Sequence, residues 1–409
     1  MSGQRILTVL GGGSVWTPCL IRQLSKLTLS EDLSIVLQGH TDLHLAEVMN
    51  FSRGFTRKPL DIRVTVDLEE AVKGASFILN QVRIGGWQAR LNDETLPIRI
   101  GGIGDESLGL GGLLAAIRSR SFVFRTSRFI LQHAPDAWLL NLTNPSDLVS
   151  RAWCEAGIQR VLSLCDYPQK WAREMARLVK RPELASNFGF IGMTHVGWLI
   201  PPPGIRLSPL WQRRPRLRSW YRKWGALPSV WRMHLDDPDT LIASQGQQTG
   251  SRVYRIMRLV EDLREVIQKK EHGQYMRLLQ ERKPVWYAEV VIPAVKGLLE
   301  GGPVHVIAGS ANRKRLPRLA GEVIVEGRAV IDRQGIHPGP LPDNTLCQQD
   351  IAGFGCLRDL AFAAMMRPNR DTLSCYVQSD PFSQAVIPGK KIDRVLHYLE
   401  ENQHISLDN

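Results

Sequence analysis

Hydrophobic residues in the first half of the chain alternate between patterns typical of strands and patterns typical of helices. Continuous apolar runs predict strands within 5–10, 33–39, 76–82, 137–146, 159–169 and 187–199. Apolar residues at helical spacing predict a helix over 19–27, and another helix precedes the third strand. Strands that alternate with helices are typical of a parallel sheet covered on both faces.

The second half of the chain has a different pattern. Residues 200–245 are rich in Pro, Trp and Arg without a clean period, and we expect an irregular cap or insertion there. The remaining pattern predicts helices at 252–268 and 288–299, strands at 304–309 and 321–332, and a helical C-terminus. We therefore predict an α/β protein with an N-terminal Rossmann-like parallel sheet (1–196) and a C-terminal α+β domain (197–409).

Composition agrees with a globular protein of this size. The 409 residues exceed the usual length of one domain, and apolar residues make up 43% of the chain. No uninterrupted apolar run reaches about 18 residues, so no membrane span is expected. The first strand begins without a signal-peptide pattern before it, and the six cysteines lack framework spacing. We expect a cytoplasmic protein with reduced thiols.

The net charge of +12 is the unusual bulk property. Part of the excess lies in 211–225, where Arg and Trp alternate. No nucleic-acid recognition module accompanies this segment, so we expect no nucleic-acid partner. An anionic substrate or a basic solvated surface remains compatible with the charge.

A run of glycines follows the first strand directly. Gly11, Gly12 and Gly13 precede Ser14, and Trp16 stands where the third glycine of a dinucleotide fingerprint would be. In such folds the glycines let the backbone approach a pyrophosphate, and the next helix directs its free N–H groups toward it. We interpret these five residues as a candidate NAD site, with a plain tight turn as the alternative.

The end of the second strand lacks a typical ribose ligand. Dinucleotide folds usually place an acidic residue there. Here Gln38, Gly39 and His40 occupy this place, and Asp42 is the first carboxylate that follows. Either Asp42 reaches the ribose or the contact is absent.

Cys165 and His195 each lie in an apolar segment at a predicted strand end. No nucleophile elbow or Cys-x-x-Cys pattern surrounds Cys165, so neither nucleophilic nor redox catalysis is indicated. Thiolate and imidazole suit a divalent transition metal, and two protein ligands would leave positions for substrate oxygens. A buried structural thiol and a structural histidine are the alternatives.

Six segments together resemble one enzyme family. They are GGGSVWTP, QVRIGGWQARLNDE, GIGDESLGLGG, NLTNPSDLV, LCDYPQ and GMTHVGWL. In order and spacing the set resembles the NAD-dependent glycoside hydrolases of family 4, which include 6-phospho-α- and 6-phospho-β-glucosidases. The resemblance covers roughly the first 200 residues closely and continues more weakly to the C-terminus. It also implies a C-terminal domain similar to that of lactate and malate dehydrogenases.

The resemblance implies a metal site and a set of substrate contacts. Cys165 and His195 would bind a divalent metal, most often manganese in this family. The residues that would contact the sugar or its phosphate are Arg90, Asn92, Asn144 and Arg252. Arg282 is a further arginine compatible with an anionic substrate.

The resemblance also bears on proton transfer. Asp166 matches the general acid of the family's α-glycosidases, and a turn-capping Asp is its alternative. The family's base is a Tyr, but Val230 falls on that position, with Met233 after it. His234, Tyr287 or a metal-bound hydroxide would have to replace this base.

We therefore expect an NAD- and metal-dependent glycosidase that acts on a phosphorylated or otherwise anionic glycoside. Its implied mechanism is oxidation at sugar C3, loss of the C2 proton and elimination of the aglycone, which differs from the usual scheme with two carboxylates. The alternatives are a malate/lactate-type NAD dehydrogenase and a non-catalytic sugar- or nucleotide-binding descendant. The partners expected are a small-molecule glycoside and further copies of the chain, in a dimer or tetramer.

Overall fold

A computed structural model describes residues 4–27, 32–56, 60–246 and 251–383, together with positions 393, 397 and 401. Its parallel sheet contains β1 (Arg5–Leu10), β2 (Leu33–Gln38), β3 (Asp61–Thr65), β4 (Phe77–Asn80), β5 (Trp138–Asn141) and β6 (Val161–Ser163). The strand order β3-β2-β1-β4-β5-β6 is that of a Rossmann sheet. All residues of β2 and β4 are buried, as strands covered on both faces require.

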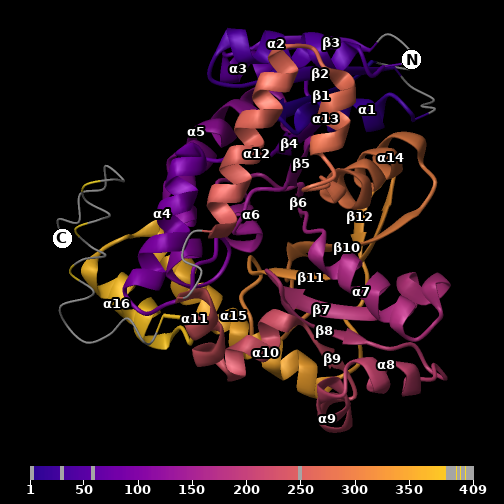
Figure 1. The fold of residues 1–409 in the computed structure, drawn as a ribbon, viewed down its shortest axis with the longest axis vertical. Helices are drawn as coiled ribbons and strands as arrows, with labels where there is room; N and C mark the ends of the chain where they lie inside the picture. The colour runs from indigo at the N-terminus through magenta and orange to yellow at the C-terminus, as the bar shows by residue number, and fades with distance from the viewer. Residues whose placement is uncertain are drawn as a thin grey trace.

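Helices cover both faces of this parallel part (Figure 1). They are α1 (Thr17–Leu24), α2 (Asp42–Arg53), α3 (Leu68–Val72), α4 (Gly86–Arg99), α5 (Gly109–His133), α6 (Ser146–Glu155) and α7 (Tyr167–Leu178). The hydroxyl of Thr8, in the middle of β1, is buried and donates to Ala71 O at the end of the sheet-facing helix α3. The predicted Rossmann-like part is therefore confirmed.

The sheet continues through antiparallel strands. They are β7 (Gly189–Met193), β8 (Val196–Ile200), β9 (Leu227–Pro228), β10 (Val304–Ala311), β11 (Ile324–Asp332) and β12 (Gly335–Pro338). β10 joins the two parts because its Gly309 pairs with Ser163 of β6. The order then runs β10-β11-β7-β8-β9, with β12 on β11. The predicted α/β class is confirmed, while the proposed division at residue 196 stays a prediction.

Two segments differ from the sequence prediction. The expected strand over 187–199 is a hairpin, because Thr194 and His195 have positive φ angles (38° and 70°) and turn the chain between β7 and β8. The expected irregular segment 200–245 contains the helices α8 (Ser208–Arg213), α9 (Arg216–Trp224), α10 (Val230–Asp236) and α11 (Pro238–Gly246). In α9, Trp220 and Trp224 lie one turn apart against the buried Trp198. The helical spacing of these tryptophans was not recognised in the sequence because many arginines lie between and around them.

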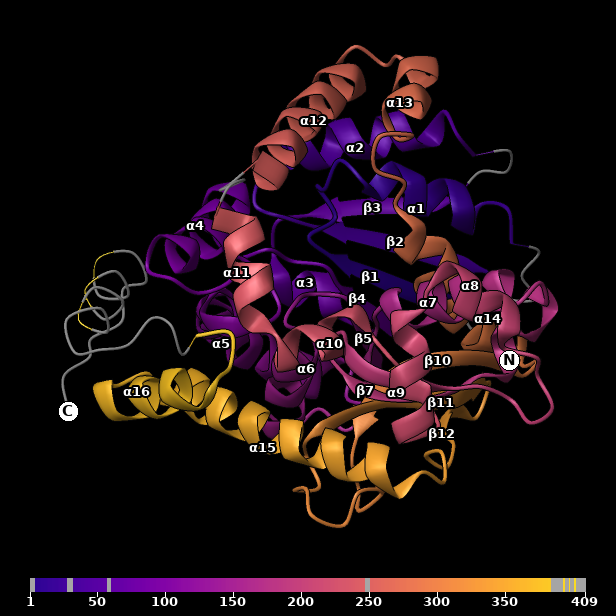
Figure 2. The same cartoon turned by 60° about the horizontal axis from the view of Figure 1, so that its bottom comes forward.

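The remaining helices follow in the last third of the chain. They are α12 (Ser251–Gln268), α13 (His272–Leu278), a π-helical turn (Tyr287–Val291), α14 (Ile292–Glu300), α15 (Thr345–Met366) and α16 (Arg370–Ser379). Figure 2 shows α15 and α16 at the side of the molecule away from β1–β3. A buried ion pair joins α15 to α6, with Arg358 Nε 2.6 Å from Asp147 Oδ2. Among the described residues, no helix is long and apolar enough to cross a membrane.

Candidate active site

A single cavity of about 1050 Å³ connects most of the residues singled out in the sequence. It begins at the glycine turn after β1, passes the carboxyl ends of β4, β5 and β6, and reaches the β7–β8 turn. The predicted site residues that line it are Gly11, Gly13, Ser14, Trp16, Arg90, Asn144, Cys165, Asp166, His195, Arg252 and Tyr287. The carboxyl edge of a parallel sheet is where α/β proteins bind their ligands.

The glycine turn brings backbone close to backbone. Gly11 has φ 81°, in the region that favours glycine, and the Gly12 N–H donates to Gln38 O over 2.7 Å. A Cβ atom at Gly12 would lie 2.7 Å from the Leu37 Cβ, so Gly12 packs against β2 and does not line the cavity. Helix α1 then begins at Thr17 with no side-chain cap at its N-terminus. The geometry suits a pyrophosphate.

Tyr287 supports this turn from the other side of the cavity. Its hydroxyl donates to Gln81 Oε1 over 2.7 Å. The Gln81 amide nitrogen in turn lies 3.1 Å from both Gly11 O and Thr17 Oγ1. Burial raises the pKa of Tyr287 far above its usual value, which disfavours its predicted role as a base. Gln81 was not among the predicted site residues, although it lies in the predicted strand 76–82 and begins a segment that carries the family resemblance.

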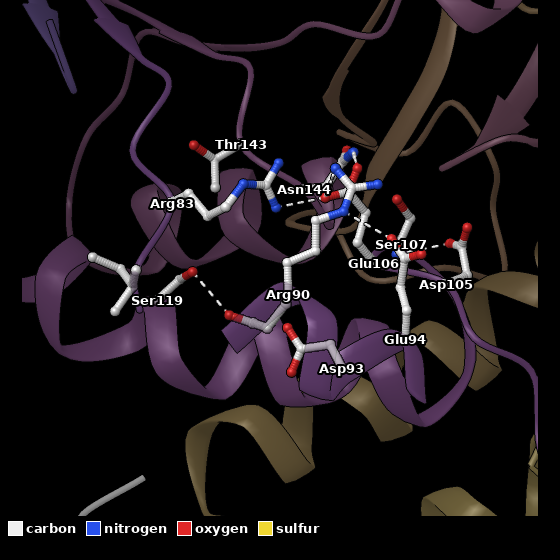
Figure 3. A network of polar contacts seen from close by, with 12 residues as sticks. Arg83, Arg90, Asp93, Glu94, Asp105, Glu106, Ser107, Ser119, Thr143 and Asn144 are labelled. Carbon is white, nitrogen blue, oxygen red and sulfur yellow. Dashed lines mark hydrogen bonds and ion pairs between the residues drawn. The ribbon is translucent and has the colours of Figure 1, made fainter. Parts of the chain in front are cut away.

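The middle of the cavity holds a cluster of arginines around one carboxylate (Figure 3). Arg90, on α4, has no exposed side-chain surface. Its Nε donates to Glu94 over 2.8 Å, and its Nη1 lies 3.0 Å from Glu106 Oε2. Arg83 donates to the same Glu106 oxygen over 2.6 Å. Within the described part of the chain, the two terminal nitrogens of Arg90 have no partner of hydrogen-bond geometry.

Positive charge exceeds negative charge in this cluster. Burial alone would raise the pKa of Glu106, but Arg83 and Arg90 outweigh it and hold this pKa far below its usual value. Burial and the neighbouring Arg90 lower the pKa of Arg282 to about 10. The Arg282 guanidinium lies 5.9 Å from the Trp16 ring centroid and 5.6 Å from that of Trp286. Its Nη1 is also buried without a partner among the described residues.

Cys165 and Asp166 lie where β6 ends and α7 begins. Asp166 is the N-cap residue of α7, but its side chain makes no capping hydrogen bond, which removes the capping alternative. Burial, and then the carboxylate of Glu289, raise the pKa of Asp166 above its usual value. Burial also raises the pKa of the Cys165 thiol. Asp166 is therefore suited to hold a proton in the cavity.

The donor set at this end fits a divalent metal with open coordination positions. His195 is partly buried, and burial lowers its pKa, which favours the neutral imidazole that a metal ligand requires. Its Nδ1 is buried without a hydrogen-bond partner in the described structure. No third His, Cys, Asp or Glu of the described residues joins Cys165 and His195 to complete a cluster that could hold a metal. Such a site depends on substrate or solvent oxygens for its other ligands.

Three predicted side chains lie off the cavity. Asn92 is on α4 beside Arg90, but its carboxamide faces Gln88 (3.5 Å) outside the cavity lining. Asp42 is exposed at the first position of α2. The His234 ring packs edge-on against Trp231, with 6.0 Å between centroids, and does not line the cavity. Helical spacing alone does not tell which of several polar residues faces the ligand.

The segment expected to supply the base presents a different side chain. Val230 is 48% exposed at the start of α10, and its N–H donates to the Tyr167 hydroxyl over 3.2 Å. The next residue, Trp231, stacks on His195 with 6.3 Å between ring centroids. The side chain that this segment presents to the candidate metal ligand is thus an indole.

Comparison with known proteins assigns the family. Residues 6–181 match the sequence model for "Family 4 glycosyl hydrolase", and residues 206–381 match the model for the "Family 4 glycosyl hydrolase C-terminal domain". The chain belongs to glycoside hydrolase family 4. The predicted family is confirmed.

This family-4 protein has relatives among curated protein sequences. It is 34% identical over 203 residues to a probable 6-phospho-beta-glucosidase of Bacillus subtilis. That match covers 47% of the chain and only 45% of the relative's length.

Solved structures resemble the family-4 protein over nearly its whole length. A 6-phospho-beta glucosidase from Thermotoga maritima with NAD and glucose-6-phosphate has a TM-score of 0.84, at 18% identity and 98% coverage of both chains. A 6-phospho-alpha-glucosidase from gut microorganisms, in complex with NAD and Mn²⁺, has a TM-score of 0.78 at 20% identity, covering 98% of both. A lactate dehydrogenase from a deep-sea metagenome follows at 0.55, with 12% identity and coverage of 90% and 100%. These likenesses confirm the predicted fold.

Proposed function

We propose that this protein is an NAD- and divalent-metal-dependent glycosidase that acts on a phosphorylated sugar. Family membership supports glycoside hydrolysis, and the relatives of similar fold include structures with NAD, with Mn²⁺ and with glucose-6-phosphate. The proposal assigns the glycine-turn end of the cavity to NAD, the Cys165–His195 end to the metal, and the arginine cluster to the phosphate.

The observation that carries the phosphate assignment is the state of Arg90. A guanidinium this deeply buried is normally fully hydrogen-bonded, because a buried unpaired donor is costly. Arg90 uses its Nε on Glu94, its Nη1 meets Glu106 only as an ion pair at 3.0 Å, and its Nη2 has no hydrogen-bond partner in the described structure. Arg282 has a free buried nitrogen as well, and both line the cavity. A planar fork of donors at this position suits the oxygens of a phosphate.

The chain's own groups would then orient the sugar and handle its protons. Asn144 lines the cavity next to the arginine cluster, with its Nδ2 3.4 Å from Glu106 Oε1, where it can bind a sugar hydroxyl. Asp166, with its raised pKa, would donate a proton to the glycosidic oxygen of the leaving group. Bound NAD would accept and return the hydride, while a metal held by Cys165 and His195 would stabilise negative charge on sugar oxygens.

Release of nitrophenol tests this proposal. We expect hydrolysis of nitrophenyl 6-phosphoglycosides only when NAD, Mn²⁺ and a reductant are all present. The unphosphorylated glycosides should react at least about a hundredfold more slowly, because the buried arginines would lack their anion. Hydrolysis without nucleotide would contradict the NAD assignment, and net accumulation of NADH would favour a simple dehydrogenase instead.

Substitution of the candidate thiolate ligand tests the metal assignment separately. We expect Cys165→Ser to weaken Mn²⁺ binding, measured by electron paramagnetic resonance, by at least about tenfold, since a neutral hydroxyl would replace an anionic thiolate as a ligand of the cation. Cys347→Ser is the matched control, because Cys347 is also buried but lies on α15 and does not line the cavity. Equal Mn²⁺ affinities in the two variants would contradict the assignment.

A further inference from the structure

The cofactor end of the cavity lacks a carboxylate at the place that normally receives the ribose of NAD. In Rossmann folds, an Asp or Glu at the end of β2 accepts hydrogen bonds from the ribose hydroxyls. β2 ends here with Gln38, and Gly39 follows. The Gln38 amide nitrogen lies 3.2 Å from Gly39 O and 3.3 Å from Val66 O, so it is directed to the backbone.

The carboxylates nearest to this end are not placed to substitute for the missing one. Asp42 is exposed and does not line the cavity. Asp67 and Glu69 do line it, but both follow β3. Asp67 Oδ1 accepts from the Glu70 N–H over 2.8 Å, and Glu69 is paired with His133 at 2.7 Å. Among the described residues at the end of β2 itself, the cavity wall carries no negative charge.

Where a carboxylate is expected at the end of β2, hydrogen-bond donors line the cavity instead. His40, Thr41 and His44 line this end, where α2 begins, and His44 Nδ1 is engaged by Glu47 Oε2 at 3.4 Å, which leaves its Nε2 as the second ring nitrogen. Thr41 is the N-cap residue of this 12-residue helix, and its side chain makes no capping bond, so the first N–H groups stay available to a ligand. Imidazole and backbone N–H groups bind phosphate oxygens well.

We propose that this site accepts dinucleotides with a 2′-phosphate, NADP(H), as well as NAD(H), and that Gly39 is the residue that permits it. The inference rests on the proposed function in one respect, namely that a nicotinamide dinucleotide occupies the glycine turn. A carboxylate at position 39 would repel a 2′-phosphate. Glycine introduces neither charge nor volume, and the nearby donors can bind the added oxygens.

Titration of the full chain with each nucleotide tests the proposal. Binding can be followed by calorimetry with NAD⁺ and NADP⁺ under the same salt conditions. We expect the two dissociation constants to agree within about thirtyfold, because a site that selects NAD by charge repulsion discriminates by more than this. A larger preference for NAD⁺ would overturn the proposal.

Restoring the carboxylate tests the role of Gly39. Its backbone conformation is open to other residues, but a Cβ would lie 3.1 Å from Leu45 Cδ2, so Leu45 must shift slightly. Gly39→Ala makes the same contact without charge and is the matched control. We expect Gly39→Asp to weaken NADP⁺ binding at least about tenfold relative to Gly39→Ala, while NAD⁺ binding is kept or strengthened. Equal NADP⁺/NAD⁺ ratios in the two variants would overturn the proposal.

A second variant covers the case in which Gly39→Asp does not fold. His40→Asp places the carboxylate one residue further on, at an exposed position that also lines the cavity. The same loss of NADP⁺ binding is expected, and an unchanged ratio would contradict the proposal. Failure of the proposed function is distinct from these results, because a protein that binds neither nucleotide would refute the function itself. Hydrolysis that depends on NAD and excludes NADP would refute only this inference.

Discussion

Two regions of the cavity, the glycine turn (the glycine end) and the arginine cluster in its middle (the arginine end), are held together by different kinds of contact. At the glycine turn, backbone meets backbone, as in the 2.7 Å bond from the Gly12 N–H to Gln38 O. In the arginine cluster, side chains carry the structure, and Arg83 and Arg90 converge on Glu106 (Figure 3). We therefore expect added side-chain volume to lower the stability of the protein most at the glycine end, and a change of charge to lower it most at the arginine end.

The largest effect is expected from removal of the central guanidinium. Arg90→Met would leave Glu94 and Glu106 with fewer counter-charges in a buried site, at a cost of about 3–5 kcal/mol in the free energy of unfolding. We also expect at least about a hundredfold loss of kcat/KM for a phosphorylated glycoside. Arg90→Lys keeps the charge but loses the fork, so it should recover stability better than activity. A Met variant as stable as the wild type would show that charge is not what holds this end.

At the glycine end, the stability of the protein depends on side-chain volume. A methyl group at Gly12 would lie 2.7 Å from Leu37 Cβ and 2.8 Å from its Cα, whereas one at Gly13 would meet nothing closer than 3.8 Å. We expect Gly12→Ala to lower the free energy of unfolding by about 1–3 kcal/mol, because the β2 backbone must move. Gly13→Ala should stay within about 0.5 kcal/mol of the wild type. Chemical denaturation measures both, and similar losses in the two variants would contradict this explanation.

The glycine end was predictable from sequence because it is local. Its strand, turn and helix are consecutive in the chain, and residues such as Gly11 and Trp16 were found from their spacing alone. Cys165 and His195 also line the cavity, but their role as metal ligands comes from family resemblance and stays a prediction, since neither residue has an informative local pattern. The sheet order in the N-terminal half follows from the same alternation of strands and helices.

The arginine end was only partly predictable because distant segments build it. Arg90 and Arg252 were expected, but Glu106, on which the cluster converges, was not, although it lies in a segment used for the family assignment. Asn92 was expected and lies off the cavity, because two residues along a helix turn the side chain to another face. Likewise, the sequence alone could not show that Trp231 would face His195.

Substitution of Arg282 is expected to weaken ligand binding at the arginine end without lowering the stability of the protein. Its charge is buried near other arginines, and its pKa is lowered to about 10, so the folded protein gains little from it. We expect Arg282→Met to keep the free energy of unfolding within about 1 kcal/mol of the wild type. Affinity for glucose 6-phosphate, measured by calorimetry, should fall about tenfold, as expected for loss of a hydrogen bond to a charged group. A large loss of stability would instead make Arg282 part of the structural network with Arg90.

The smallest effect concerns Asp105, the neighbour of Glu106. It is fully buried, and burial raises its pKa to about 6. Because the folded protein then binds this proton more tightly than the unfolded chain, stability is lost as the pH rises from about 4 to about 6 and above. Asn keeps an oxygen that can accept from the Ser107 and Leu108 N–H groups, now 2.8 and 3.0 Å from Asp105 Oδ1.

We therefore expect Asp105→Asn to gain stability over the wild type by about 1 kcal/mol more at pH 7.5 than at pH 5. Urea unfolding of both proteins at the two pH values measures this difference. Gly13→Ala is the control from the glycine end, and the difference between its free energy of unfolding and that of the wild type should not change with pH. If the stability difference between Asp105→Asn and the wild type is also independent of pH, then a change of charge affects stability only at the residues that contact Arg90.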